Sequence, residues 1–229
     1  MALLIFAVLS LLVAGELQAG VVVGGTRFIF PADRESISIL LTNTSQESWL
    51  INSKINRPTR WAGGEVSTVP APLLAAPPLI LLKPGTTGTL RLLRTESDIL
   101  PVDRETLFEL SIASVPSGKV ENQSVKVAMR SVFKLFWRPE GLPGDPLEAY
   151  QQLRWTRNSQ GVQLTNPTPY YINLIQVSVN GKALSNVGVV PPKSQRQTSW
   201  CQAIAPCHVA WRAINDYGGL SAKKEQNLP

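Results

Sequence analysis

The sequence predicts an all-β fold built from two β-sandwich domains, and three observations support this. From Val21 onward, short runs of β-branched, aromatic and alternating residues are interrupted at intervals of roughly ten residues by Pro, Gly, Asn, Asp or Ser. Helix signals are nearly absent. The segment RPEGLPGDP at 138–146 separates a strongly apolar strand from a fresh set of strand signals, and we interpret it as an interdomain linker.

Residues 1–19 are set apart from the fold as an expected secretory signal peptide. MALLIFAVLSLLVAGELQA is an apolar run closed by small residues, although it lacks a basic start. Leu17 and Ala19 suit the −3 and −1 positions of a cleavage site, which would leave a mature chain from Gly20. The run is shorter than the roughly 18 residues that a membrane helix needs, so no stable membrane insertion is expected.

The first domain is expected to span residues 20–139. SISILLTNTS (36–45) and SWLINSKI (48–55) are predicted as neighbouring strands, and GTLRLLRT (88–95) and TLFELSIASV (106–115) as two more. Each run is rich in apolar or β-branched residues and ends near a turn former. These strands account for one sandwich.

The second domain is expected to span residues 140–229. Asp145 and Pro146 precede LEAYQQL, a pattern that predicts one short helical turn. The NSQG segment at 158–161 and the NG pair at 180–181 predict hairpin turns between strands.

Cys201 and Cys207 are the two cysteines of the chain. In an exported protein, cysteines this close together predict a local disulfide. The bond could staple a hairpin whose turn contains Ala205 and Pro206. A zinc site is not expected, because His208 is the single histidine and adjoins Cys207.

Composition argues against two broad classes of function. The formal net charge is +6, but the basic residues are scattered and no aromatic stacking platform accompanies them, so nucleic-acid binding is not expected. An enzyme is not expected either, since the sequence has no G-x-S-x-G motif, metal-ligand spacing or glycine-rich phosphate loop. No catalytic residue, metal or cofactor is therefore assigned.

The most informative segment is SVKVAMRSVFKLFWRP at 124–139. Apolar side chains recur with a period of two, which predicts one long strand. The opposite face carries four basic residues at Lys126, Arg130, Lys134 and Arg138. A central strand buried on one side would explain the apolar face, but it would leave the four basic residues unexplained.

Five blocks of the chain resemble the signature blocks of the periplasmic pilus chaperones, in the same order and spacing. They are GGTRFIFP (24–31), DRETLFEL (103–110), RSVFKLFWRP (130–139), NPTPYY (166–171) and INDYG (214–218). The resemblance implies two immunoglobulin-like domains set at an angle, with a cleft between them. It also implies a periplasmic chaperone that lends a strand to fimbrial subunits and delivers them to an outer-membrane usher for pilus assembly.

The resemblance assigns roles to individual residues. Arg27 and Lys134 match the pair that anchors the C-terminal carboxylate of the subunit, and both side chains are expected to be partly exposed in the cleft. Val125, Val127 and Met129 match the apolar side chains that fill the groove of an incomplete subunit. Lys134 and Val125 have opposite parity along the strand, so a bulge or a strong twist is expected between them.

Glu105, Arg138 and Asp216 match a charged cluster that ties the two domains together. The resemblance assigns this cluster to the domain angle rather than to subunit contact. The connection PSGKVENQ (116–123) is short, which resembles the short-loop subclass of these chaperones, associated with rod-like fimbriae.

Two non-enzymatic functions are alternatives to a chaperone. A surface adhesion module would suit the sequons NTS (43–45) and NQS (122–124), but its cysteines would be expected far apart, across the two sheets. A pilus subunit would be a single incomplete domain with cysteines near its start. The two-domain layout, together with Arg27 and Lys134, disfavours both alternatives.

Overall fold

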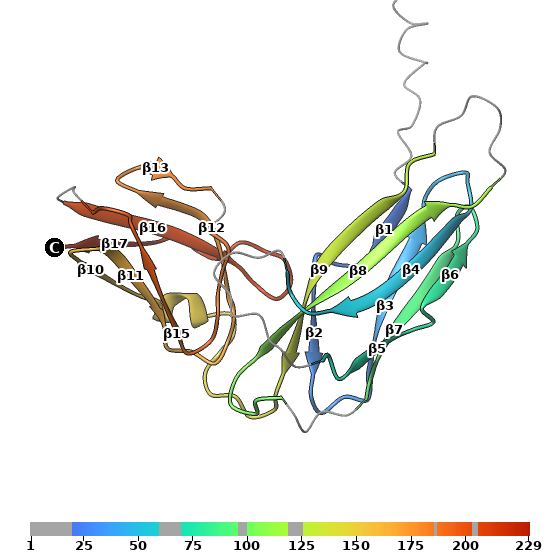
Figure 1. Cartoon of the computed structure of the whole chain (residues 1–229), viewed down its shortest axis with the longest axis horizontal. Coiled ribbons are helices and arrows are strands. Elements are labelled where there is room, and N and C mark those ends of the chain that lie inside the picture. Colours follow the sequence, from blue (N-terminus) through green and yellow to red (C-terminus); the bar gives the residue numbers. More distant parts are fainter. Residues whose placement is uncertain (1–19, 60–69, 96–99, 119–125, 186, 203–205) are drawn as a thin grey trace, which may run out of the picture.

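The computed structural model contains two β-sandwiches joined by a strand-free segment at 139–148 (Figure 1). It describes residues 20–59, 70–95, 100–118, 126–185, 187–202 and 206–229. The predicted all-β fold of two immunoglobulin-like domains is confirmed. The signal peptide expected at 1–19 lies outside the described residues.

The first sandwich packs a four-stranded sheet against a five-stranded sheet. The smaller sheet has the order β1 (Val21–Val23), β3 (Ser36–Asn43), β7 (Thr87–Arg94), β5 (Leu73–Ala76). The larger sheet has the order β2 (Arg27–Pro31), β9 (Met129–Arg138), β8 (Thr106–Pro116), β4 (Trp49–Asn56), β6 (Leu79–Leu82). The inward side chains of both sheets form one core, which includes Phe30, Leu41, Ile51, Leu90, Phe108 and Leu135.

The expectation that 36–45 and 48–55 form neighbouring strands is wrong. β3 pairs with β1 and β7, whereas β4 pairs with β6 and β8 in the opposite sheet. The chain crosses between the sheets at 44–48, because the apolar faces of β3 and β4 then meet in the core instead of lying side by side. Adjacency in the sequence carried no information about this pairing.

The second sandwich contains the remaining strands. One sheet has the order β10 (Arg154–Asn158), β11 (Gly161–Asn166), β15 (Ser194–Thr198). In the other, β13 (Lys182–Ala183), β12 (Ile172–Val179), β16 (Cys207–Ile214) and β17 (Lys224–Leu228) lie in this order, and β14 (Val189–Val190) also pairs with β12.

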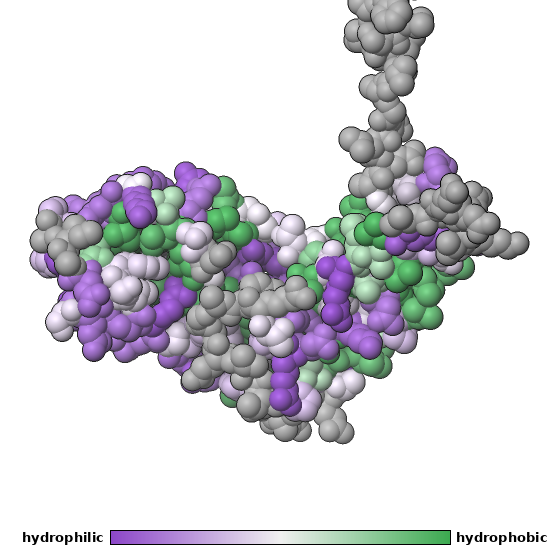
Figure 2. All heavy atoms as spheres, turned by 45° about the horizontal axis from the view of Figure 1, so that its top comes forward, coloured by the Kyte–Doolittle hydropathy of each residue, from purple (hydrophilic) through white to green (hydrophobic). Residues whose placement is uncertain are grey.

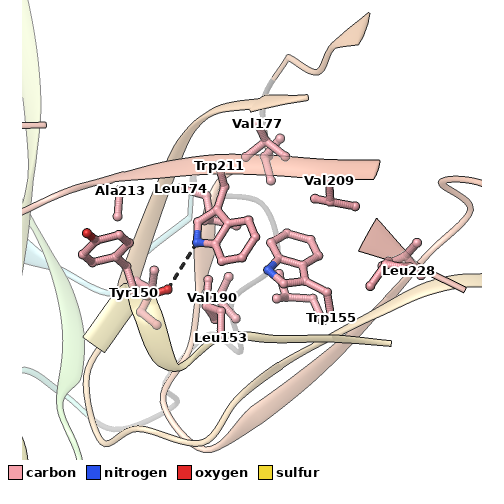
Figure 3. Close-up of a cluster of buried hydrophobic side chains, with 14 of the residues drawn as sticks. Tyr150, Leu153, Trp155, Leu174, Val177, Val190, Val209, Trp211, Ala213 and Leu228 are labelled. Carbon is pink, nitrogen blue, oxygen red and sulfur yellow. Dashed lines mark hydrogen bonds between the residues drawn. The ribbon is translucent and has the colours of Figure 1, made fainter. Parts of the chain in front are cut away.

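The core of the second sandwich is built around tryptophans (Figure 3). The ring centroids of Trp155 and Trp211 lie 5.2 Å apart. The Nε1–H of Trp211 donates to the carbonyl of Tyr150 at 3.2 Å, so the tryptophan buries its ring without losing its hydrogen bond. Tyr150 lies in the 3-10 helix η1 (Ala149–Gln152), where the sequence predicts a helical turn.

The two predicted hairpin turns are present. Asn158 and Gly161 are paired across the β10–β11 turn, and Val179 and Lys182 across the β12–β13 turn. Asn180 and Gly181 have φ values of 49° and 76°, the left-handed conformations that a two-residue hairpin turn requires.

A fully buried asparagine ends one strand in each sandwich, Asn43 in β3 and Asn166 in β11. Each side-chain oxygen accepts from the backbone N–H of the residue two positions on, Ser45 or Thr168, at 3.0 Å. Each amide nitrogen also donates to carbonyl groups of distant segments. The side chain of Asn43 is therefore buried and hydrogen-bonded within the fold, and it is not exposed for glycosylation.

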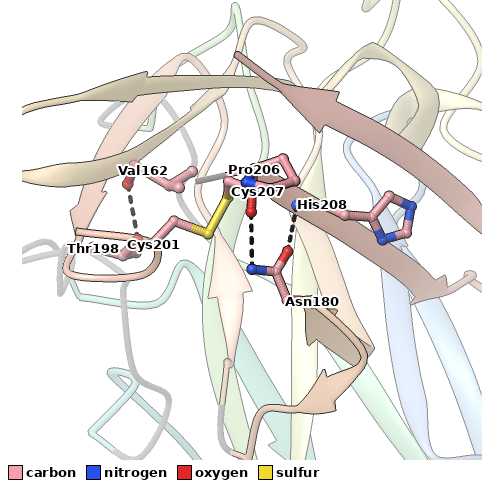
Figure 4. Close-up of a disulfide and its surroundings, with 7 residues drawn as sticks. All are labelled: Val162, Asn180, Thr198, Cys201, Pro206, Cys207 and His208. Atoms are coloured by element: carbon pink, nitrogen blue, oxygen red, sulfur yellow. Dashed lines mark hydrogen bonds between the residues drawn. A yellow bond between two sulfur atoms is a disulfide. The ribbon is translucent and has the colours of Figure 1, made fainter. Parts of the chain in front are cut away.

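The disulfide between Cys201 and Cys207 is present (Figure 4), but the predicted hairpin around it is not. β15 pairs with β11, whereas β16 pairs with β12 and β17 in the other sheet. The bond therefore closes the loop that crosses from one sheet to the other. Nearby, Asn180 donates to the carbonyl of Pro206 at 3.0 Å and accepts from the N–H of His208 at 2.7 Å.

Replacing both cysteines by serine should lower the free energy of unfolding of the second sandwich by about 2 kcal/mol, because the closed loop is short. Urea unfolding of the oxidised protein and the double variant measures this difference. Equal free energies of unfolding in the two proteins would contradict a stabilising role for the disulfide.

Candidate functional site

One face of the five-stranded sheet is turned toward the second sandwich. Leu135 and Trp137 of β9 point into the first core, so the even-numbered side chains of this strand point the other way. Among these, Phe136 lies 5.6 Å from Tyr171 between ring centroids. Phe136 belongs to a small apolar cluster of both sandwiches, formed by Ile29, Leu107, Phe136, Tyr171 and Val189.

Glu105, Arg138 and Asp216 lie together beside this apolar cluster. Arg138 ends β9, Glu105 precedes β8, and Asp216 follows β16 of the second sandwich. Arg138 Nε donates to Glu105 Oε1 at 2.7 Å, and Arg138 Nη1 donates to Asp216 Oδ2 at 2.7 Å. One guanidinium therefore bridges carboxylates from both sandwiches, and we call these three residues the ion cluster.

Glu105 is the most deeply buried member of the ion cluster, with 3% of its surface exposed. Its Oε2 accepts from the backbone N–H of Tyr171 at 2.7 Å, and its own N–H donates to the carbonyl of Pro169 at 2.9 Å. Burial raises the pKa of Glu105 to about 7, although Arg138 and the Tyr171 N–H oppose this shift. Burial alone would lower the pKa of Arg138, but its bonds to the two carboxylates raise that pKa above the ordinary value.

A second ion pair joins the sandwiches at the surface, where Lys193 Nζ lies 2.6 Å from Asp103 Oδ2. Both side chains are well exposed, so the pair adds little stability. The main connection is therefore made by the ion cluster and the apolar cluster.

Arg27 and Lys134 are cross-strand neighbours, because β2 runs parallel to β9 with Arg27 in register with Lys134. Burial, and secondarily the nearby Arg27, lower the pKa of Lys134 to about 8. Burial also lowers the pKa of Arg27, against the opposing effect of Asp216. The two cations thus lie side by side on the sheet face that carries Phe136. The surface is hollowed between the two sandwiches (Figure 2).

The expectation that Arg27 is partly exposed is wrong. Only 9% of its surface is accessible, because the end of β16 covers it and the carbonyl of Ile214 accepts from Arg27 Nη1 at 3.0 Å. Lys134 is half-buried.

One edge of β9 is incompletely paired within the part of the chain that the structure describes. β8 pairs with β9 from Met129 to Trp137, but β2 pairs with it only from Lys134 to Arg138. Along Met129–Phe133, no described strand lies on the β2 side. This stretch, the open edge, ends where Arg27 and Lys134 begin.

The apolar residues expected to enter a subunit groove lie at the start of this edge. Val127 and Met129 are 63% and 50% exposed, and Val125 lies outside the described residues. β9 begins at Met129, opposite Ser114 of β8, rather than at 124. The predicted bulge is absent between Met129 and Trp137, where the register with β8 is continuous, so Met129 and Lys134 point to opposite faces.

A group of polar residues on the sheet face that carries Lys134 was not identified from the sequence; it consists of Glu109, Ser111 and Arg130. Glu109 of β8 is 4% exposed and accepts from the N–H of Thr59 at 2.6 Å. Arg130 Nε donates to Ser111 Oγ at 3.0 Å. The alternation of side chains in TLFELSIASV could have revealed this group, because it places Glu109 and Ser111 on the same face of the strand as Leu107.

Across the described ranges, no group of three or more His, Cys, Asp or Glu side chains is placed to hold a metal ion. None of the helical residues described forms a helix of the length and hydropathy needed to cross a bilayer.

The buried carboxyl of Glu105 predicts a pH-dependent stability. Its pKa is about 7 in the folded protein against about 4.5 ordinarily, so the folded state holds the proton more tightly. The stabilisation is fully present below about pH 4.5 and is lost as the pH rises through about 7. Urea unfolding should therefore show a free energy of unfolding that decreases across this range.

Glu105→Gln is the matched variant, because it keeps the shape of the side chain and cannot ionise. It should show a smaller decrease than the wild type between about pH 5 and about pH 7. Lost hydrogen bonds would lower its stability equally at every pH. Identical pH slopes in the two proteins would contradict the assigned pKa.

Two family models match the chain. The model described as "Pili and flagellar-assembly chaperone, PapD N-terminal domain" matches residues 20–143, and "Pili assembly chaperone PapD, C-terminal domain" matches residues 148–225. Between them they cover the first sandwich and all but the last strand of the second in full.

Individual proteins agree with these models. The chain is 99% identical over 229 residues to a protein of Escherichia coli described as "Uncharacterized fimbrial chaperone YcbF", with 100% of this chain and 97% of the relative covered. It is 32% identical to the chaperone protein FimC of Escherichia coli, covering 94% of this chain and 87% of FimC.

A solved structure of the Salmonella enterica SafA pilin in complex with the SafB chaperone gives a chain that matches with a TM-score of 0.77 and 30% identity. The match covers 93% of this chain and 98% of that one. The chain therefore belongs to the PapD family of pilus-assembly chaperones, which are assembly factors rather than enzymes.

Proposed function

We propose that this chaperone binds an incomplete fimbrial subunit along the open edge of β9 and completes the subunit with its own strand. The observation that carries the proposal is that the open edge, Met129–Phe133, ends at the paired cations Arg27 and Lys134. The similarity to a chain from a pilin–chaperone complex supports fimbrial subunits as the partner.

The geometry of β2 favours one direction for the added strand. A strand beside Met129–Phe133 would lie in line with β2, which runs parallel to β9 and begins at Arg27. If the added strand is also parallel, its C-terminal end reaches Arg27 and Lys134. An antiparallel strand would instead begin beside the two cations. Its N-terminal ammonium would then be repelled by them. Only the parallel strand offers them a carboxylate.

The carboxylate would gain strong hydrogen bonds at this position. The guanidinium of Arg27 and the ammonium of Lys134 both donate, and bonds between ionised groups are shorter and stronger than neutral ones. Arg27 is held by the carbonyl of Ile214, so less ordering is needed when the carboxylate binds. This anchor would fix the register of the subunit strand against β9.

Val125, Val127 and Met129 would supply the apolar part of the interaction. Alternation places all three on one face, and the two that the structure describes are at least half exposed. A sandwich that lacks one strand exposes both core surface and an unpaired edge. The chaperone strand would cover both at once.

The ion cluster would fix the angle between the sandwiches. Two of its bonds cross between the sandwiches, one from Arg138 to Asp216 and one from the N–H of Tyr171 to the buried carboxylate of Glu105. Rotation of one sandwich would break both. Such clusters add little net stability, and an orienting role is the contribution we assign to this one.

Periplasmic location, removal of residues 1–19 and delivery to an outer-membrane usher are part of the same proposal. The apolar run ending at Ala19 supports export. The chain's membership of the pilus-assembly family supports transfer to an usher.

The proposal is tested by co-purification of co-expressed fimbrial subunits with the tagged chaperone from a periplasmic extract. The wild type, beginning at Gly20, should retain a stoichiometric amount of subunit. Lys134→Ala and Arg27→Ala should reduce the retained subunit by about tenfold or more, because each removes a charge-assisted anchor. Lys83→Ala, which removes an exposed cation from a turn, is the control.

Circular dichroism and urea unfolding should show that Lys134→Ala is folded. A folded Lys134→Ala variant that retains as much subunit as the wild type would overturn the anchor. Failure of the folded wild type to retain any subunit would overturn the proposed function itself.

The affinity for the subunit should also depend on pH through Lys134. Its pKa is about 8 in the free chaperone, and a bound carboxylate would raise it by favouring the ammonium form. Binding is therefore strongest below about pH 8 and weakens above it, by as much as about tenfold per pH unit.

Titration calorimetry at a series of pH values measures this dependence, and Lys134→Arg, which stays charged, should bind with a flatter profile. A wild-type affinity that is constant from about pH 7 to about pH 10 would show that no proton is taken up on binding.

A further inference from the structure

An open pocket of about 420 Å³ lies on the sheet face that carries Lys134, farther along β9. β4 and the segment after it, β8 and β9 all contribute to its lining, which includes Arg57, Thr59, Glu109, Ser111, Arg130 and Val132. We call it the arginine pocket.

The described residues that line the arginine pocket include two arginines and one carboxylate. The carboxylate, on Glu109, is buried and accepts from the N–H of Thr59. Arg57 and Arg130 form no ion pair with any residue that the structure describes. Arg130 is oriented by its bond to Ser111 Oγ at 3.0 Å, so its guanidinium is held in place without being neutralised.

The proposed register brings a subunit side chain to this pocket. Arg27 occupies the position opposite Lys134, so the last residue of an added strand lies opposite Phe133. Counting back along the parallel strand, the penultimate residue lies beside Val132, and the third residue before the last lies beside Arg130. Since side chains alternate, these two residues share the face of the pocket.

We infer that the arginine pocket binds an acidic side chain at the third residue before the subunit's C-terminus, and that Arg130 makes subunit binding selective for that residue. The inference rests on the proposed function, because it takes its register from the carboxylate anchor. The arginine pocket would thus read the sequence of the strand, whereas Arg27 and Lys134 contact the carboxylate that every chain possesses.

The test uses fluorescein-labelled peptides of alternating Val and Ser that end in a free carboxylate, with Glu, Gln or Lys as the third residue before the last. Fluorescence anisotropy should show that the wild type binds the Glu peptide about five- to tenfold more tightly than the Gln peptide. Arg130→Gln should reduce this preference to about twofold or less, and Arg130→Glu should favour the Lys peptide.

Arg91→Gln is the matched control, since Arg91 also lies on a strand and donates to a serine hydroxyl, Ser36 Oγ, at 3.1 Å. Arg91 lies on the other sheet, so this variant should keep the wild-type preference. Equal binding of the Glu and Gln peptides by the wild type, or an unchanged preference in Arg130→Gln, would overturn the inference.

An amidated Glu peptide distinguishes failure of the carboxylate anchor from failure of the arginine pocket. If the wild type binds the free carboxylate no better than the amide, the anchor and the proposed function fail. If it discriminates between these two but not between Glu and Gln, only the role of the arginine pocket fails.

Discussion

Hydrogen bonding by β9 is the constraint on which the rest of the structure depends. One edge of this strand is paired with β8 from Met129 to Trp137, while the other is divided between β2 and an open stretch. Because β2 begins only at Arg27, the open stretch has a defined end, and two cations mark it. The same strand sends Leu135 into the core of the first sandwich and Phe136 into the apolar cluster between the sandwiches. Folding of the first sandwich therefore also places Phe136 on the face that contacts the second sandwich.

A chain of interacting charged groups runs from one sandwich to the other. Asp216 bonds to Arg138 and also influences the ionisation of Arg27. Arg138 bonds in turn to Glu105, whose second oxygen accepts from the N–H of Tyr171. A change in the angle between the sandwiches would move Asp216 relative to both arginines. The geometry of the proposed carboxylate anchor would thus depend on the orientation of the second sandwich, although Arg27 and Lys134 belong to the first.

Local features of this fold could be predicted from the sequence, and long-range pairings could not. The turns at Asn158–Gly161 and Asn180–Gly181 and the disulfide depend on residues close together in the chain. The placement of β3 and β4 in different sheets, and of the disulfide between sheets, depends on partners far away. The burial of Arg27 also escaped prediction, because Ile214, which covers it, is 187 positions distant. Resemblance to a family supplied the candidate anchor residues, but it gave no sign of the arginine pocket, whose residues come from three separate segments.

The cations beside the open edge also affect whether two copies of the chaperone can pair through this edge. An unpaired strand edge invites pairing with the same edge of another copy, which leads to self-association. Here Arg130 lies on the open stretch, and Arg27 and Lys134 lie at its end. Two copies that approached edge to edge would bring these like charges together, and the repulsion would oppose their association. A strand that ends in a carboxylate would instead be attracted by the same charges. The charges at the open edge would therefore favour the proposed subunit strand over a second copy of the chaperone.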